Sequence, residues 1–319
     1  MTTAALVSAG SGALPSLFTA QPEARRRLRD FFSSHIRNRN TRRAYMEAVR
    51  QFAAFCAELG LGELEQVDAV HVAAFVERQL QTNSRPTAKQ RLAALRMLFD
   101  WMVVGQVMAS NPAHAVRGPK HTQKKGKTLV LTPAEARELL DAIDVESVVG
   151  LRDRALIAMM VYSFARVGAV LGMRVEDFFV QGRRGWVRLH EKGGKLHEMP
   201  THHNLDKYLE AYIAAAGIAN ERKEPLFRTT RARTGELTDH AMLQSDVWRM
   251  IRRRAEAAGI ETEIGCHSFR ATGITAYLKN GGKLEIAQQM ANHESARTTG
   301  LYDRRSDEIS LDEVERIGI

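Results

Sequence analysis

Apolar residues recur every three or four positions through the first third of the chain, which is the spacing of amphipathic helices. The clearest case spans residues 41–59, whose apolar face is formed by Tyr45, Val49, Phe52, Cys56 and Leu59. Similar patterns predict three further helices, over residues 21–36, 67–80 and 86–104. The connections between these helices are short, so a compact helical bundle is expected.

A second domain begins at Thr132-Pro133-Ala134-Glu135, a capping threonine followed by proline and glutamate at the first and third helical positions. Helical patterns follow over residues 133–141, 151–164, 205–215, 239–258, 268–278 and 284–291. Three short strands are predicted over residues 178–180, 185–190 and 196–199, with the turn 192–195 joining the last two as a hairpin. The expected fold is therefore mainly α, with a small β-sheet in a C-terminal α+β domain.

Composition places the boundaries between these parts. Residues 1–20 are small and polar without an early positive charge, and are interpreted as a disordered tail, not as a signal peptide. An Asn-Pro pair closes the helical domain, residues 21–112, and residues 113–128 form a linker with five basic and no acidic side chains. The second domain then spans residues 129–305, and residues 306–319 form a C-terminal tail.

The net charge of +9 is unevenly distributed. Residues 1–128 contain 19 Lys and Arg against 9 Asp and Glu, whereas residues 129–319 contain 27 against 28. The basic excess therefore lies in the first part of the chain, which is typical of a module that binds a polyanion such as nucleic acid. A basic domain that is merely soluble would show the same excess of positive charge, so charge alone does not show that this module binds nucleic acid.

The two cysteines, Cys56 and Cys266, are far apart and predict no disulfide framework, which suits a reducing cytoplasm. No apolar run approaches the roughly 20 residues needed to span a bilayer. The sequence has neither a phosphate-binding glycine loop with G-x-x-x-x-G-K spacing nor the cysteine spacing of a zinc site. Four histidines raise zinc as an alternative, but they are interpreted as solvated strand and loop positions: His190, His197, His202 and His203.

Five stretches contain side chains that are candidates for catalysis. Arg166 follows an apolar helix, where burial of an unpaired arginine would raise the free energy of the folded state. The others are the hairpin lysines Lys192 and Lys195, the pair His267 and Arg270 on one face of a helix start, His293 after a helix, and Tyr302 nine residues further on. Taken singly, each has an ordinary explanation as an ion pair, a solvated lysine, a helix cap or core packing.

In order and spacing, this set resembles the catalytic residues of the tyrosine recombinase, or phage integrase, family. Residues 40–45 and the Asn111-Pro112 exit are similar to the family's helical core-binding domain, and residues 131–135 to the entry of its catalytic domain. The resemblance assigns Arg166 and Arg270 as catalytic arginines, His267 and His293 as catalytic histidines, Lys192 as the hairpin lysine with Lys195 as second candidate, and Tyr302 as the nucleophile.

This resemblance implies a site-specific DNA recombinase that cleaves and rejoins DNA through a 3′-phosphotyrosyl intermediate. The two arginines would grip the nonbridging phosphate oxygens and His293 would hydrogen-bond the phosphate. His267 would help to remove the phenol proton, and Lys192 would protonate the leaving 5′ oxygen. The cations neutralise the phosphate and the phosphotyrosine retains the bond energy, so no metal ion, nucleotide or other cofactor is expected.

Three positions depart from the family pattern. Ala169 stands where an acidic residue commonly follows the first arginine by three, and Ala271 stands where a histidine often follows the second arginine. The usual Leu-Gly-His before the second histidine is Ala291-Asn292-His293. These departures bear on rate and subfamily more than on mechanism.

Both domains are expected to close on double-stranded DNA at a specific site. Phosphate or base contacts are assigned to Arg42, Arg43, Lys89, Arg91, Lys124, Lys125 and Lys195, although a solvated side chain is an equal alternative for the helix positions. Apolar residues in the acidic tail predict a short amphipathic helix: Ile309, Leu311, Val314 and Ile317. This helix is expected to dock on a neighbouring protomer in a DNA-bound homotetramer, and packing on its own domain is the alternative. The expected location is the cytoplasm, associated with the nucleoid and with no membrane contact.

Two other classes of function compete with this one. A type IB topoisomerase-like enzyme would use the same tyrosine chemistry to relax supercoils without exchanging partners. A DNA-binding factor with a decayed active site would keep the fold without the chemistry. The core-binding domain and the apolar tail disfavour the first class, and the complete set of six catalytic residues disfavours the second.

Overall fold

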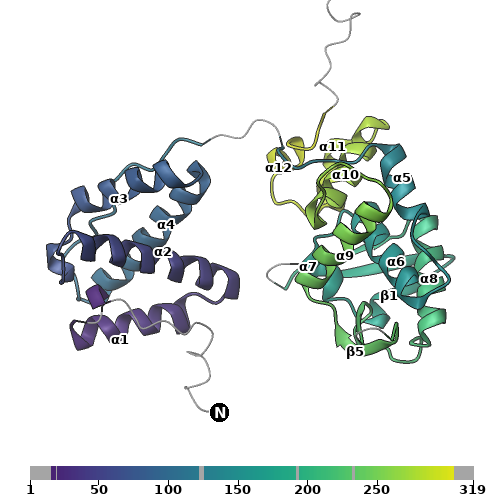
Figure 1. Cartoon of the computed structure of the whole chain (residues 1–319), viewed down its shortest axis with the longest axis horizontal. Coiled ribbons are helices and arrows are strands. Elements are labelled where there is room, and N and C mark those ends of the chain that lie inside the picture. Colours follow the sequence, from purple (N-terminus) through teal and green to yellow (C-terminus); the bar gives the residue numbers. More distant parts are fainter. Residues whose placement is uncertain (1–15, 19, 122–125, 192–193, 232–233, 305–319) are drawn as a thin grey trace, which may run out of the picture. The chain divides into compact units, whose positions relative to one another are not determined.

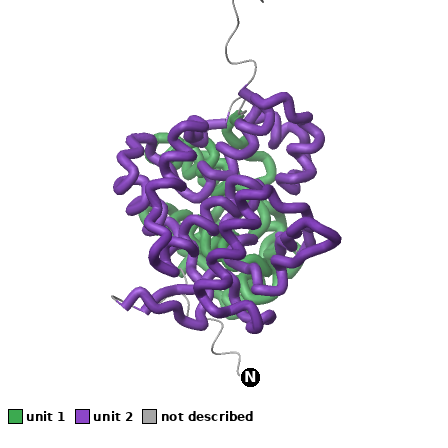
Figure 2. Tube along the Cα trace, turned by 90° about the vertical axis from the view of Figure 1, so that its right-hand side faces the viewer, with its two compact units in different colours: residues 1–122 green, residues 123–319 purple. Residues whose placement is uncertain are grey.

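The structure is a computed structural model that describes residues 16–18, 20–121, 126–191, 194–231 and 234–304. The chain divides into two compact units, residues 1–122 and 123–319, which Figure 2 shows in different colours. The large clusters of buried apolar side chains lie within one unit or the other, so each unit has a hydrophobic core of its own.

In the part of the chain that the structure describes, the first unit is a bundle of four α-helices, as the apolar spacing predicts (Figure 1). They are α1 (Pro22–Asp30), which continues into a π-helical turn (Phe31–His35), α2 (Arg39–Glu58), α3 (Ala69–Thr82) and α4 (Arg85–Val104), with a short 3-10 turn (Leu64–Gln66) before α3. Rings from three of these helices meet in the core, where Phe52 packs edge-on against Phe75 and Phe99 at centroid distances of 5.2 and 5.9 Å. Aromatic pairs of this geometry stabilise a core beyond the area that they bury.

Two expected boundaries of this unit are wrong in detail. Ser16–Phe18 form a 3-10 turn, and Leu17 and Phe18 are buried in the bundle, so these residues do not belong to a disordered tail. Ala113 and Val116, placed in the linker, are also buried in this core, and Arg96 donates hydrogen bonds to the carbonyl oxygens of both. Burial of these apolar side chains favours packing of both segments against the helices. Residues 1–15 and 19 lie outside the described residues.

Over its described residues, the second unit combines helices with two small antiparallel sheets (Figure 1). Its helices are α5 (Pro133–Asp141), α6 (Val148–Tyr162), α7 (Val167–Leu171), α8 (His203–Ala216), α9 (Gln244–Ala257), α10 (Cys266–Lys279), α11 (Leu284–Met290) and α12 (Ala296–Gly300). The three predicted strands are confirmed and pair in the order β1 (Phe178–Gln181), β2 (Arg184–His190), β3 (Leu196–Pro200). Alternate residues of β2, including Val187 and Leu189, face the core, so the period-2 pattern of the sequence is that of a half-buried strand.

A second sheet, β4 (Arg228–Thr230) with β5 (Leu237–Ala241), was not predicted. The expected helix over residues 239–258 is wrong at its start, because residues 239–241 pair as strand and α9 begins only at Gln244. The carboxylate of Asp246 accepts a hydrogen bond from the backbone N–H of Leu243 at 2.9 Å, which fixes the helix start at this point. These strands are too short and too polar to produce a clear alternation.

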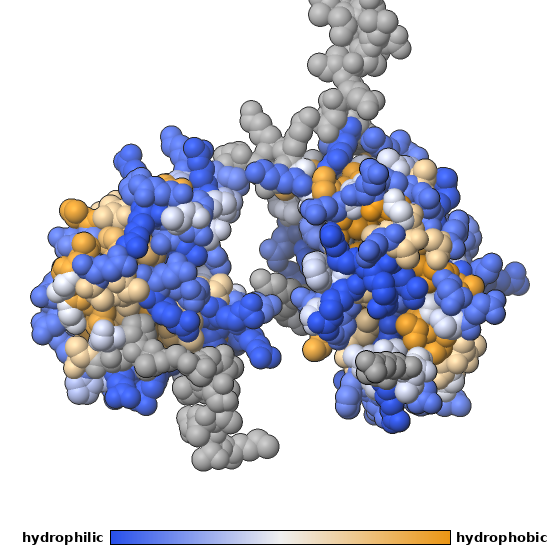
Figure 3. Space-filling model, in the orientation of Figure 1, coloured by the Kyte–Doolittle hydropathy of each residue, from blue (hydrophilic) through white to orange (hydrophobic). Residues whose placement is uncertain are grey.

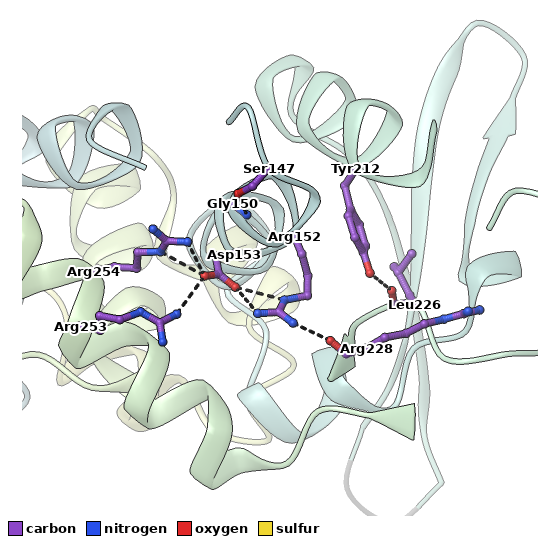
Figure 4. A network of polar contacts seen from close by, with 9 residues as sticks. All are labelled: Ser147, Gly150, Arg152, Asp153, Tyr212, Leu226, Arg228, Arg253 and Arg254. Atoms are coloured by element: carbon purple, nitrogen blue, oxygen red, sulfur yellow. Dashed lines mark hydrogen bonds and ion pairs between the residues drawn. The ribbon is translucent and has the colours of Figure 1, made fainter. Parts of the chain in front are cut away.

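A buried carboxylate ties α6 to α9 in this unit (Figure 4). Asp153 on α6 is fully buried and accepts hydrogen bonds from Arg152 at 2.7 Å and from Arg254 at 2.8 Å, with Arg253 at 3.5 Å. Arg152 also donates to the backbone carbonyl of Arg228 on β4 at 2.7 Å. Removal of charge from water is costly, so such a carboxylate is stable only because several guanidiniums surround it.

Hydrophilic side chains cover most of the visible face of each unit, with smaller apolar areas between them (Figure 3). Exposed apolar side chains include Val70, Val104, Leu243 and Trp248. Among the helices of the described residues, none is both long enough and apolar enough to cross a membrane.

Candidate active site

Arg270 on α10 joins two sharp turns of the second unit. Its side chain is buried, with the residue 1% exposed, and it donates hydrogen bonds to the carbonyl oxygen of Phe164 and, at 2.5 Å, to that of Ala291. Phe164 has a φ of 54°, and Asn292, which follows Ala291, has a φ of 47°. Both segments therefore turn through the left-handed region, where residues other than glycine are uncommon. The arginine therefore fixes the segment after α6 against the segment after α11.

The functional candidates Arg166 and His293 come directly after these two turns. Arg166 lies just before α7, and its Nη1 donates to the carboxylate of Glu191 at 2.8 Å. The Glu191 side chain is only 4% exposed, whereas that of Arg166 is 43% exposed. Ala169, the position where the resemblance leads one to expect an acidic residue, is buried and apolar, so the carboxylate on Arg166 comes from the end of β2 instead.

The nucleophile candidate Tyr302 lies just after α12 and is 8% exposed. Its phenol oxygen is 2.7 Å from Nε2 of His267, which lies in the first turn of α10. This distance is that of a hydrogen bond, which the hydroxyl donates when the imidazole is neutral. The arrangement is suited to transfer of the phenol proton to the histidine.

Several contacts hold the backbone around Tyr302. The Thr275 hydroxyl on α10 donates to the Tyr302 carbonyl oxygen at 3.1 Å, and the Gly126 N–H donates to the carbonyl of Leu301 at 2.9 Å. A Cβ at Gly126 would lie 2.6 Å from that same carbonyl oxygen, so the close approach requires glycine. Arg304 donates to the carbonyl of Thr128 at 2.9 Å, so residues 126–128 and 301–304 lie side by side.

His293 is buried next to the tyrosine. Its ring is nearly parallel to that of Tyr302, with an interplanar angle of 8° and a centroid distance of 6.0 Å. Its Nδ1 lies 2.9 Å from the hydroxyl oxygen of Thr299, a residue of α12 with no exposed surface. The imidazole is therefore held on one edge by a side chain that no sequence pattern identified.

Burial and neighbouring arginines set the protonation states. Burial, followed by the charges of Arg270 and Arg166, lowers the pKa of His267, and the same causes with His267 lower the pKa of His293 to about 3. Burial raises the pKa of Tyr302, although both arginine charges oppose this shift. Burial, followed by Arg166, lowers the pKa of Arg270 to about 10. At neutral pH the site therefore contains two neutral imidazoles, a protonated phenol and two guanidinium cations.

Five of the six predicted catalytic residues are thus brought into one site, and Lys192 lies outside the described residues. Lys195, immediately before β3, forms an exposed ion pair with Glu294 at 3.0 Å between Nζ and Oε1. This pair joins the β2–β3 hairpin to the segment that contains His293. Glu191 and Thr299 were not identified from the sequence, because their relevance depends on contacts with Arg166 and His293 that only the fold creates.

The residues predicted to contact DNA in the first unit lie within the first two turns of α2 and α4. Arg43 and Lys89 are exposed, and Arg91 is half-buried. Arg42 donates to the carbonyl oxygen of Ile36 through Nε at 3.1 Å and through Nη2 at 2.8 Å, so much of its hydrogen-bonding capacity holds the turn before α2. Lys124 and Lys125 lie outside the described residues. Among the described residues, no group of three or more His, Cys, Asp or Glu side chains is placed to hold a metal ion.

A helical unit followed by an α+β unit that gathers two arginines, two histidines and a tyrosine defines a protein of the tyrosine recombinase class. Comparison with known families agrees: the chain belongs to the phage integrase family, which residues 129–308 match, and residues 28–104 match the N-terminal SAM-like domain of phage integrases. As a member of this family, it is an enzyme of site-specific DNA recombination.

Individual relatives extend over most of the chain. Tyrosine recombinase XerC of Vibrio atlanticus is 26% identical over 269 residues, which cover 82% of each chain. Among solved structures, the XerH site-specific recombinase in a post-cleavage complex with a palindromic difH substrate matches with a TM-score of 0.70 at 18% identity, covering 95% of this chain and 91% of that one. A lambda integrase tetramer bound to a Holliday junction matches with a TM-score of 0.68 at 19% identity, covering 91% and 80%. At these identities, the structural matches establish the fold alone.

Proposed function

We propose that this recombinase cleaves and rejoins DNA at a specific site by attack of Tyr302 on the scissile phosphate, through a 3′-phosphotyrosyl intermediate. The observation that supports this best is the 2.7 Å hydrogen bond between the phenol and His267, beside Arg270. A phenol has a reference pKa near 10 and is a weak nucleophile at neutral pH unless a base removes its proton. A neutral imidazole at hydrogen-bonding distance is such a base.

The two arginines bind the nonbridging oxygens of the phosphate, where negative charge develops during attack. Arg270 has both terminal nitrogens on carbonyl oxygens, and its Nε is buried without a hydrogen-bond partner among the described residues. A buried donor without an acceptor is unfavourable, and a phosphate oxygen would satisfy it once the side chain shifts to expose this atom, which has almost no accessible surface in the unbound chain. Glu191 holds Nη1 of Arg166 and leaves the rest of this guanidinium for the phosphate.

Proton transfer accompanies the exchange of bonds at phosphorus. The bond from Tyr302 Oη to phosphorus forms as the bond from phosphorus to the 5′ oxygen breaks, and the phenol proton passes to His267. Lys192 gives a proton to the departing 5′ oxygen, which is otherwise a poor leaving group. Attack by another 5′ hydroxyl reverses these transfers and joins new partners. Two guanidiniums supply the charge that metal ions supply in other phosphoryl-transfer sites, so the step includes no metal ion or nucleotide.

The partner is double-stranded DNA, bound by both units. The basic excess of residues 1–128 and the exposed Arg43 and Lys89 support phosphate contacts from the first unit. Lys195 would exchange its surface ion pair with Glu294 for a phosphate, because exposed pairs are weak. We infer that the enzyme acts in the cytoplasm, where its DNA lies with the nucleoid.

The active assembly is a homotetramer on two DNA sites. A structural relative is described as a tetramer bound to a Holliday junction, which supports this assembly. The tail, residues 306–319, is expected to dock on a neighbouring protomer, and it lies outside the described residues. Deletion of residues 306–319 should abolish assembly of two sites into one complex, and unchanged assembly would contradict this role.

A DNA substrate that is nicked close to the scissile phosphate tests the proposal, because the short cleaved fragment diffuses away and the covalent adduct accumulates. The wild-type chain should form an adduct that survives denaturation, and a DNA-binding factor without catalysis would form none. Strand exchange between two sites separates a recombinase from a topoisomerase-like enzyme, which would relax supercoils without joining new partners.

A further inference from the structure

We propose that Thr299 is a positioning residue that fixes the tautomer of His293, so that this histidine presents an N–H at Nε2 to the phosphate. The inference depends on the proposed function only for its last step, the contact with phosphate. Its starting point is the 2.9 Å distance between Nδ1 of His293 and the hydroxyl oxygen of Thr299.

The hydroxyl proton of Thr299 determines the direction of this hydrogen bond. Thr299 has no exposed surface, so its hydroxyl has no access to bulk water. Among the described residues, Nδ1 of His293 is the one acceptor within hydrogen-bond reach of this hydroxyl. If Nδ1 were protonated and donated to Thr299 instead, the hydroxyl proton would be buried without an acceptor, which proteins avoid.

The opposite edge of the ring then follows from the chemistry of imidazole. A neutral imidazole has one N–H, so an Nδ1 that accepts from Thr299 places the proton on Nε2. The low pKa of His293, about 3, excludes a doubly protonated ring at neutral pH, so the tautomer alone decides whether Nε2 donates or accepts. Only the donating form is attracted to a phosphate oxygen; the accepting form would present a lone pair to an anion.

The same threonine also contacts the nucleophile segment. Its carbonyl oxygen accepts a hydrogen bond from the backbone N–H of Tyr302 at 2.9 Å. Thr299 therefore fixes the ring of His293 through its side chain and the backbone of Tyr302 through its main chain. The two rings lie nearly parallel at 6.0 Å, and Thr299 is hydrogen-bonded to both residues, so it contributes to their relative positions together with the contacts of Thr275 and His267.

The direct test is the protonation pattern of His293 in the full-length chain with 15N-labelled histidine. Long-range proton–nitrogen correlation spectra at pH 7 distinguish the two tautomers. The protein has 11 histidines, so the signal of His293 is identified by its loss in His293→Gln. A proton on Nε2 supports the proposal, and a proton on Nδ1 in the wild-type chain overturns it without need of any threonine variant.

Two substitutions then test the positioning role. Thr299→Val keeps the shape and removes the hydroxyl, so His293 should become a mixture of tautomers and adduct formation on the nicked substrate should fall about ten-fold, as for one lost hydrogen bond. Thr299→Ser restores the hydroxyl and should recover both the single tautomer and the wild-type rate, while DNA binding stays unchanged in both variants.

The outcomes separate this inference from the proposed function. A Thr299→Val chain that keeps the wild-type tautomer and rate would overturn the role of the threonine, as would a changed tautomer with an unchanged rate. Absence of any adduct in the wild-type chain would instead contradict the proposed function, while the tautomer measured in the same protein would still report on the hydrogen bond.

Discussion

The phenol oxygen of Tyr302 and Nε2 of His267 lie 2.7 Å apart, in surroundings that disfavour charge on both groups. Burial and two arginine charges lower the pKa of His267 below its usual value of 6.5, so the imidazole is already neutral and able to accept a proton at neutral pH. Burial raises the pKa of the phenol, so the tyrosine keeps its proton until the histidine takes it.

This relationship predicts the pH dependence of cleavage. Single-turnover adduct formation should rise with pH as His267 loses its proton and should become level at a pH below about 6.5, because the pKa is lowered. DNA binding measured at each pH separates binding from chemistry. A rate that continues to rise about ten-fold per pH unit between pH 7 and 9 would indicate prior ionisation of the phenol and would contradict the role of His267 as base.

Glu191 orients Arg166, so Glu191→Gln should impair cleavage more than binding. The amide keeps the shape but loses the charge that holds Nη1, and we expect about a ten-fold slower cleavage, equivalent to one weakened charge-assisted hydrogen bond. Loss of a negative charge beside the phosphate should leave DNA binding unchanged or tighter. Glu198→Gln on β3, which removes an exposed partner of Arg188, is the matched control and should cleave normally. Equal rates for both variants would exclude an orienting role.

A change of the leaving atom from oxygen to sulfur tests which of the two hairpin lysines is the general acid. Lys192→Ala should slow cleavage about 100-fold or more if this lysine is the general acid. A substrate with sulfur in place of the bridging 5′ oxygen needs no protonation to depart, so it should largely restore the rate of Lys192→Ala. Lys195→Ala, which breaks the surface pair with Glu294, should show a smaller defect that sulfur does not relieve. Rescue of Lys195→Ala instead would assign the acid to Lys195.

Asp153 is expected to stabilise the second unit without taking part in the chemistry. Asp153→Asn leaves three arginines around a buried site without their carboxylate, and we expect a loss of about 3–5 kcal/mol in the free energy of unfolding. Chemical denaturation of the full chain, followed by circular dichroism, measures this loss. Glu58→Gln removes the exposed partner of Arg78 and should change the unfolding midpoint little. Equal midpoints for the two variants would show that the network contributes no stability.

Local periodicity predicts most of the secondary structure. The apolar spacing of residues 41–59 corresponds to α2, and the alternation over residues 185–190 corresponds to β2. The hairpin β4–β5 was missed because its strands contain three and five residues and depend on each other for hydrogen bonds. The sequence pattern places Leu17 and Phe18 in a tail, because their burial depends on helices far along the chain. Tertiary contacts of this kind leave no local pattern.

The sequence predicts which residues form the candidate site, but it does not predict the contacts between them. The order of Arg166, His267, Arg270, His293 and Tyr302 led to the family, and the structure brings these residues into one site. The engagement of Arg270 with the carbonyl of Phe164 joins residues 106 positions apart, and no local pattern encodes it. For the same reason, only the fold shows that Glu191 supplies the carboxylate on Arg166, whereas position 169 is an alanine.

The substitution Tyr302→Phe tests the central claim most directly, because it removes one oxygen atom from the proposed nucleophile. Its ring should still pack beside His293, and DNA binding measured by gel shift should equal that of the wild-type chain. On the nicked substrate, the wild-type chain should form a covalent adduct that survives denaturation, and the Tyr302→Phe chain should form none. A covalent adduct of the Tyr302→Phe chain would contradict the assignment of Tyr302 as the nucleophile.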